Sequence, residues 1–329
     1  RASMPILNTD LIYNRKIREN QTLLQEYEVI IYKRELIRNI KAAYFNYLGA
    51  REGVSIYQSA LTRAQEGKRV NESLLANGKG LPAYVLRSLS EIENIKAQLV
   101  DAERQVENAK LYINFLLNRD ADEEIITAYS AEENLLNASL LIQEPATVQK
   151  REELMQIQTL KGLNENLLSM NKLYWSPKIS GFVDLGAQAE NLSYTSNANY
   201  NLIGVQLEMP LFAGLTNRHK ISQSRLEIKN TELSASQINQ QLNLSTQFSK
   251  NSLISAFQNY QSAQKQLEAA QSYQRLIDKG YKEGINTFIE AVDARNQLTS
   301  AQLLVTLNQY RVLIAEANLE RETAAYTFK

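Results

Sequence analysis

Long stretches without helix breakers constrain this chain more than any other feature. Proline is absent from residues 14–78, 84–118, 215–279 and 286–327, and glycine occurs only in the first of these stretches. Each stretch is far longer than the three to four turns of an ordinary globular helix. We therefore expect four very long helices, which are typical of coiled coils and helical arrays.

The apolar residues in these stretches follow a heptad-like pattern. In residues 85–116 they recur at alternating steps of three and four: Val85, Leu89, Ile92, Ile95, Leu99, Ala102, Val106, Ala109, Ile113 and Leu116. Residues 291–319 carry two such seams, and Val305 of one lies about 200° around the helix from Leu307 of the other. A helix with two seams is expected to pack between two neighbours, as in a sheet or closed barrel of helices.

Residues 176–213 have a different period. Val183 and Leu185 alternate with polar residues before an Asn- and Ser-rich loop, and Ile203, Val205 and Leu207 alternate with polar residues after it. A period of two indicates β-strands with one apolar and one polar face. The hairpin could be a half-buried part of a soluble sheet. Because the helices leave no other sheet for it to join, we favour strands of a transmembrane β-barrel, apolar towards lipid and polar towards the lumen.

Composition excludes several function classes. The chain has no Cys, one His (His219) and equal numbers of basic and acidic residues, 36 of each. We expect no metal site and no His-based catalytic triad. We also expect no nucleic-acid partner and no cofactor, because no glycine-rich phosphate loop is present. An enzyme is the least favoured reading. No apolar run is long enough for a membrane-spanning helix.

The chain contains an internal duplication. KAQLV at 96–100 matches SAQLL at 300–304, and YQSA occurs at both 57–60 and 260–263. SMPIL near the start matches EMPLF in the second half, and Gly80 with Leu81 matches Gly284 with Ile285. All these pairs are separated by 203 to 205 residues. Matches that keep one order and spacing predict a tandem repeat.

We divide the chain into a first repeat, 1–150, and a second repeat, 151–329. The second is expected to contain a helix, a β-hairpin at 176–213 and a long helical hairpin at 214–329. The first begins at the end of a strand, so we expect that a helix and a strand precede residue 1 in the full gene product. The predicted fold is mainly α with a small β part.

These features resemble the TolC-like outer-membrane efflux channel family over essentially the whole chain. The most specific stretch, GYKEGINTFIEAVDARNQL at 280–298, looks like the family's second-repeat tip. Its matching positions are Tyr281, Gly284, Glu290, Asp293, Ala294 and Leu298. LEMPLFAGL at 207–215 resembles the family's strand-to-helix element, but has Leu215 where the family often has a second Gly.

The resemblance implies a homotrimer in the bacterial outer membrane. Each protomer would give four strands to a β-barrel in lipid and four helical strands to an α-barrel that extends into the periplasm. Residues 120–150, acidic and irregular, would form a belt around its waist. The partners would be a periplasmic adaptor protein and an inner-membrane pump. Drug efflux, metal efflux and protein secretion are all compatible with such a duct.

The resemblance also assigns roles to the second tip. Glu290 and Asp293 would form stacked acidic rings at a pore constriction, although acids at a helix start are also explained by the helix dipole. Tyr281 would tether the tips, but the family's Arg is replaced by Asn286. The family's first-repeat Asp falls at Leu86. We therefore expect the neighbouring Arg87 to pair with an acid near the second tip.

The two turns are the expected adaptor contact. Gly280 and Gly284 are predicted to end one helix and reverse the chain, as Gly80 does in the first repeat. The apolar residues Leu81, Pro82 and Ile285 either dock the adaptor or pack within their own hairpins. The alternatives to a channel are a soluble periplasmic adaptor, which has a single helical hairpin, and a non-channel helical scaffold.

Overall fold

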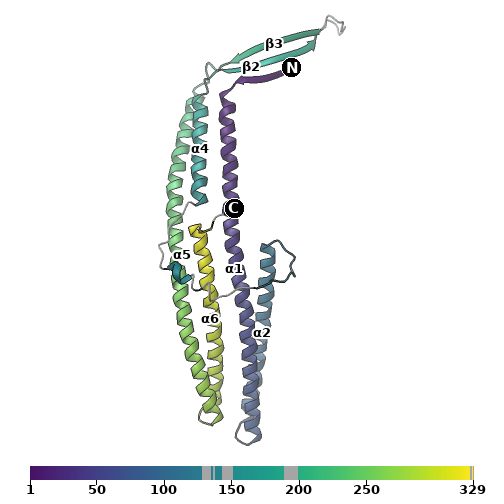
Figure 1. The fold of residues 1–329 in the computed structure, drawn as a ribbon, viewed down its shortest axis with the longest axis vertical. Coiled ribbons are helices and arrows are strands. Elements are labelled where there is room, and N and C mark those ends of the chain that lie inside the picture. The colour runs from purple at the N-terminus through teal and green to yellow at the C-terminus, as the bar shows by residue number, and fades with distance from the viewer. Residues whose placement is uncertain (128–134, 136–137, 143–150, 189–198, 327, 329) are drawn as a thin grey trace. The chain divides into compact units, whose positions relative to one another are not determined.

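The computed structural model describes residues 1–127, 135, 138–142, 151–188, 199–326 and 328. It confirms a mainly helical chain with a small sheet (Figure 1). The helices are α1 (Thr9–Ala76), α2 (Pro82–Leu116), α4 (Glu152–Lys172), α5 (Thr216–Lys282) and α6 (Phe288–Thr323). The strands are β1 (Ala2–Leu7), β2 (Lys178–Ala187) and β3 (Asn199–Glu208). Most of the predicted belt at 120–150 lies outside the described residues.

The chain forms two compact units. Unit one comprises Arg1–Tyr32 and Lys150–Gln241, and unit two comprises Lys33–Gln149 and Leu242–Lys329. Each unit draws on both predicted repeats, because α1 and α5 each run through both units. The repeat boundary near residue 150 is therefore a division of the sequence that does not coincide with the division in space.

The sheet of unit one has the order β1-β2-β3, and both pairs are antiparallel. Opposite Val183 of β2 lie Ala2 of β1 and Ile203 of β3. Because directly paired residues share a face, the register places the odd-numbered apolar residues of β2 and β3 together. That face is exposed, and it includes Val205 at 70% and Leu207 at 65%. Phe182 lies on the opposite face, against Gly204.

Side-chain hydrogen bonds join α4 to α5 in unit one. Asn164 Nδ2 donates to Thr231 Oγ1 at 3.0 Å, and Asn171 Nδ2 donates to Ser224 Oγ at 2.9 Å. Thr231 and Ser224 are both buried. The contact between these helices is therefore partly polar, and its buried hydroxyls are paired as buried polar groups generally are.

In unit two, α6 lies between α5 and α1 (Figure 1). Val312 and Leu319 pack with Leu253 of α5, whereas Tyr310 and Leu313 pack with Phe45 of α1. The two predicted seams therefore each find a neighbour. The small residues Ala60 and Ala64 join α1 to α2, together with Ile92 and Ile95.

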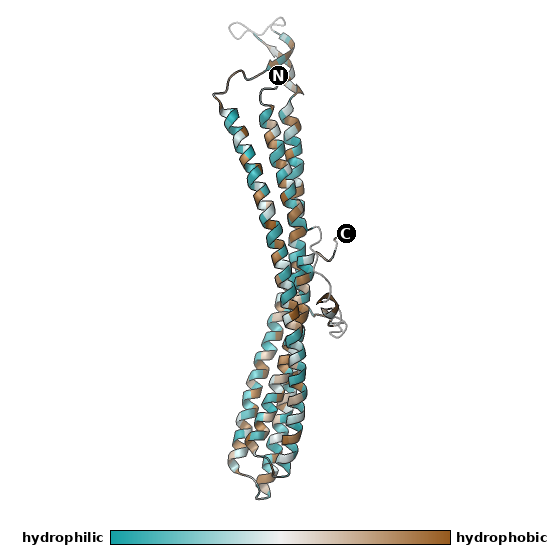
Figure 2. Cartoon of the chain, turned by 90° about the vertical axis from the view of Figure 1, so that its left-hand side faces the viewer, coloured by the Kyte–Doolittle hydropathy of each residue, from teal (hydrophilic) through white to brown (hydrophobic). Residues whose placement is uncertain are grey.

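Hydrophilic and hydrophobic residues are interspersed along all of the long helices (Figure 2). In the part of the chain that the structure describes, no helix has an apolar stretch that could cross a bilayer.

Candidate functional site at the helix tips

The turn between α5 and α6 is closed by a Schellman motif, in which the chain leaves the helix through a residue with positive φ. That residue is Gly284, with φ of 79°. The Ile285 N–H donates to the Gly280 carbonyl at 2.8 Å, and the Gly284 N–H donates to the Tyr281 carbonyl at 3.1 Å. Gly284 therefore ends the helix as predicted. Gly280 does not end it, because α5 continues to Lys282.

Gly280 has a different role. A Cβ at this position would lie 2.0 Å from Asn286 Oδ1, so the absence of a side chain allows Asn286 to fold back over α5. Asn286 Nδ2 in turn donates to Glu290 Oε2 at 3.3 Å. Gly280 thus allows the turn to be compact rather than allowing an unusual backbone angle.

The turn between α1 and α2 has the same motif in a different register. Gly78 has the positive φ, 70°, and the Lys79 N–H donates to the Leu74 carbonyl at 2.8 Å. The structural counterpart of Gly284 is therefore Gly78, two residues before the Gly80 that the sequence match selected. Gly80 is needed for space, since a Cβ there would lie 2.8 Å from Leu75 N.

Apolar residues project from both turns. Leu81 is 54% exposed, Ile285 is 75% exposed and Pro82 is also exposed. In a Schellman motif the residue after the positive-φ position commonly contacts the side chain five residues earlier. For Ile285 that residue is Gly280, which has no side chain. Ile285 therefore lacks the side-chain contact that commonly accompanies this motif.

Buried hydrogen bonds connect the two hairpins within the helices, next to the turns. The Tyr281 hydroxyl on α5 donates to Asn71 Oδ1 on α1. Asn71 Nδ2 donates to Ser88 Oγ on α2 at 2.7 Å, and Ser88 Oγ donates to the Tyr84 carbonyl at 2.9 Å. Asn71 is 2% exposed and Ser88 is 1% exposed. One connected set of bonds thus joins α5 to α1 and α2.

Aromatic rings surround this set. The rings of Tyr84 and Phe288 stack with centroids 4.8 Å apart, and Tyr281 lies 6.2 Å from Phe288. Ala291 is fully buried against them, which allows α6 to approach closely. Burial raises the pKa of the Tyr281 hydroxyl above its usual range. The hydroxyl therefore remains a donor at neutral pH.

The two positions considered for the first-repeat tether both lie at the surface of the single chain. Leu86 is 67% exposed, and the exposed Arg87 makes no ion pair with any described residue. Arg87 acts instead on its own helix, where its charge opposes the burial that raises the pKa of Glu91. Within one chain, the residue that bonds to Tyr281 is Asn71, which lies on α1, and the pairing of Arg87 stays a prediction.

The heptad pattern held a signal for both missed residues. Asn71 continues the buried series Ala60, Ala64 and Gly67 at steps of four, three and four. Ser88 rather than Leu89 occupies the buried seam position before Ile92. A polar residue inside an apolar seam is the pattern expected when it has a specific buried partner.

Glu290 completes the start of α6. Thr287 Oγ1 accepts from the Glu290 N–H at 3.3 Å, and Glu290 Oε2 accepts from the Thr287 N–H at 2.7 Å. This is a capping box. The bond from the Thr287 backbone, followed by those from the Thr287 and Asn286 side chains, lowers the pKa of Glu290. The structure therefore gives Glu290 a local structural role. Asp293 has a different setting, because it is exposed and lines a groove between α5 and α6 together with Tyr273.

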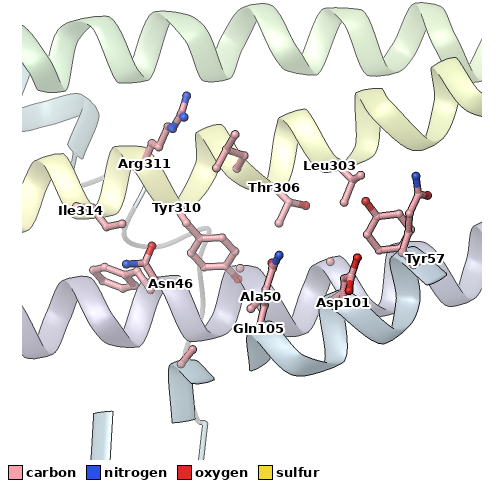
Figure 3. A pocket seen from close by; sticks show the side chains of 17 residues that line it. Asn46, Ala50, Tyr57, Asp101, Gln105, Leu303, Thr306, Tyr310, Arg311 and Ile314 are labelled. Atoms are coloured by element: carbon pink, nitrogen blue, oxygen red, sulfur yellow. The ribbon is translucent and has the colours of Figure 1, made fainter. Parts of the chain in front are cut away.

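A larger cavity of about 620 Å³ lies between α1, α2 and α6 (Figure 3). It exists because α1 presents Gly49, Ala50 and Gly53 towards it. Tyr310 lines it and donates to Glu52 Oε2 at 3.2 Å, and burial followed by the Glu52 charge raises the pKa of Tyr310. Asp101 is its carboxylate, and no paired acid and base face each other in the lining.

A family model matches the second half of the chain. Residues 170–324 match the outer membrane efflux protein family. The resemblance seen in the sequence is confirmed. The matched residues include β2, β3, α5, α6 and the whole second tip. No curated protein sequence matches the chain.

Solved structures of membrane proteins share the fold. The MtrE outer membrane channel of Neisseria gonorrhoeae is 18% identical, with a TM-score of 0.79 over 98% of this chain and 73% of that chain. VceC of Vibrio cholerae is 15% identical, with a TM-score of 0.77 over 98% and 77%. A Pseudomonas aeruginosa membrane protein is 14% identical, with a TM-score of 0.80 over 98% and 76%.

Proposed function

We propose that this chain is the protomer of a trimeric outer-membrane duct that exports molecules from the periplasm. The observation that carries the proposal is the exposed apolar sheet face, found on a fold shared with outer-membrane channels. Leu185, Ile203 and Val205 on that face are 66%, 78% and 70% exposed. An apolar area of this kind is unfavourable in water, and it fits the lipid-facing side of a membrane strand.

The opposite face of the sheet suits an aqueous lumen. It carries Asp184, Ser180 and Gln206, which the register places on the side opposite to Val183, together with Phe182 and Leu202. β1 and β3 are edge strands in the single chain, with backbone groups free to pair on their outer sides. Closure with further copies removes such edges, and cyclic symmetry is the usual way to achieve it.

The periplasmic entrance of the duct is assigned to the two tips. Three copies of Asp293 would form an acidic ring, with Glu290 forming a second ring near the start of the same helix. Rings of carboxylates favour cations over anions. Tyr281 and Asn71 would restrain the tips in the closed state, since their bond is buried and joins two hairpins.

The exposed turns would receive the partner. Leu81, Pro82 and Ile285 form exposed apolar projections on the turns, and they suit contacts with a periplasmic adaptor protein. The adaptor would connect the duct to an inner-membrane pump, which would select the cargo. The capping box fixes the start of α6, so that Ile285 precedes a rigid helix.

Single-channel conductance of the full-length protein in planar bilayers tests the proposal. We expect a small, cation-selective conductance. Asp293→Asn should weaken cation selectivity because it removes one ring of charge and changes no capping bond. Glu290→Gln should have a similar effect on selectivity while keeping an acceptor for the Thr287 N–H. Asp101→Asn, which lies in the cavity between helices, is the matched control.

Two results would contradict the proposal. Folded protein that inserts and conducts with unchanged selectivity in both tip variants would remove the acidic constriction. Folded protein that never conducts would remove the channel, and a soluble adaptor or helical scaffold would then be the better account.

A further inference from the structure

A buried arginine, Arg295, contacts several helices of unit two near the two helix-tip turns. Arg295 of α6 is only 7% exposed, and its guanidinium lies directly against α1. The contact is possible because α1 has Gly67 there. A Cβ at Gly67 would lie 2.2 Å from Arg295 Nη1 and 2.7 Å from Cζ. Gly67 has an ordinary helical φ. Glycine is therefore needed here to leave room for the guanidinium and not to allow an unusual backbone conformation.

Charges from the other helices converge on Arg295. Asp278 of α5 forms an ion pair with Arg295 Nε at 3.7 Å. Glu91 of α2 is partly buried, and burial raises the pKa of its carboxyl although the charge of Arg295 opposes the rise. Arg295 therefore interacts with α1, α2 and α5 from its position on α6.

Arg63 of α1 makes a second polar connection nearby. Its Nη2 donates to Thr299 Oγ1 at 3.0 Å and to Gln302 Oε1 at 3.2 Å, both on α6. Arg295 Nη1 and Glu91 Oε2 have no hydrogen-bond partner among the described residues. A buried guanidinium of this kind holds one arrangement through its carboxylate partners, and removing it leaves those carboxylates without their cation, which destabilises the packed state.

Arg295 and Asp293 lie on different sides of α6. Arg295 follows Asp293 by two residues, which places the two side chains about 200° apart around α6. Asp293 is therefore on the exposed side when Arg295 is buried against Gly67. A rotation of α6 that withdraws Arg295 from Gly67 must also turn Asp293 away from its present direction.

We propose that Arg295, seated against Gly67, is a second restraint on opening, which sets the rotation of α6 and hence the direction of Asp293. The inference rests on the proposed function and adds residues that are separate from the Tyr281–Asn71 bond. Arg295 is a positioning residue in this scheme, since it acts on the pore through Asp293.

Gly67→Ala gives a clean perturbation. The new methyl group meets the end of a flexible side chain, so the guanidinium can move aside while the helices stay packed. Arg295→Met removes the charge and keeps most of the length. Gly53→Ala is the matched control on α1, because a Cβ there meets nothing within 4 Å. The assay is single-channel recording of the full-length protein, with thermal unfolding measured in parallel.

We expect Gly67→Ala and Arg295→Met each to raise the open probability by about 5- to 30-fold, and Gly53→Ala to leave it unchanged. The double variant should resemble Arg295→Met alone, because both changes remove the same contact. If Arg295→Met fails to fold, Arg295→Lys replaces it, since lysine cannot present the planar guanidinium.

The outcomes separate the two proposals. Wild-type gating in Gly67→Ala and in the Arg295 variant would overturn this inference and leave the duct intact. Additive effects in the double variant would also overturn it, because the contact would then not be shared. Silence of the wild type and all variants would overturn the proposed function, and the inference with it.

Discussion

Tyr281→Phe is the most direct test of how the tips are held together. The substitution keeps the ring, so the packing against Phe288 and Leu74 remains. Only the hydroxyl is lost. Asn71 Oδ1 then has no donor in a site where Asn71 is 2% exposed. An unsatisfied buried acceptor costs about 1–3 kcal/mol.

A cost of that size has a measurable local consequence. Opening of the tips should become about 5- to 150-fold more frequent. Native-state hydrogen exchange at backbone amides near residues 71 and 281 measures this frequency directly. Tyr273→Phe is the control, because Tyr273 is on the same helix and its side chain is 36% exposed.

The bond also has a predictable pH dependence. Burial raises the pKa of Tyr281 above that of an unfolded tyrosine, about 10. Its contribution is therefore fully present below about pH 10 and is lost as pH rises through the higher folded value. Exchange at the tips should not change between pH 5 and 9 on account of Tyr281.

The reasoning is refuted if Tyr281→Phe exchanges at the wild-type rate. It is also refuted if Tyr281→Phe and Asn71→Leu have independent effects. Residues in one buried network are expected to couple by about 0.5–3 kcal/mol.

Further predictions concern the second turn and the sheet. Thr287→Ala should destabilise α6 by about 1 kcal/mol through loss of its cap, measured by chemical denaturation. The contribution of Glu290, whose pKa is lowered, should be present above about pH 4.3 and lost as pH falls below its folded value, so the Thr287→Ala defect should shrink in acid. Gly284→Ala should cost about 1–2 kcal/mol because alanine disfavours positive φ, and an unchanged denaturation midpoint would contradict this. Val205→Lys should impair insertion into lipid vesicles by about 2–4 kcal/mol if that face meets lipid, whereas Gln206→Lys on the other face should not.

Most of the fold follows from local and periodic information. Long stretches of helix-forming residues without breakers predicted the four longest helices. The observed ends of α1 and α5 differ only slightly from the ends of the predicted stretches. The period of two predicted the hairpin, although β3 ends at Glu208 and leaves Met209 and Leu211 outside it. These predictions succeeded because backbone propensity and side-chain alternation depend on nearby residues alone.

The seams of α6 were also readable from the sequence. Asn308, Val312 and Leu319 of the first seam are buried, and so is Tyr310 of the second, whereas Leu307 of the second seam is 47% exposed. Which helices fill the two sides was not readable, because a seam specifies a direction around its own helix and not the identity of a neighbour. The structure assigns one side to α5 and the other to α1.

Only the tertiary structure decided the details of the tips. The sequence match aligned Gly80 with Gly284, but the positive φ belongs to Gly78. It placed the family's first-repeat Asp position at Leu86, whereas the residue that bonds to Tyr281 is Asn71 on α1. A shift of two residues in such a match moves a position about 200° around its helix, which can exchange a buried face for an exposed one. Repeat matching tolerates such a slip, whereas a hydrogen bond between helices does not, so the tether could be located only once the helices were packed together.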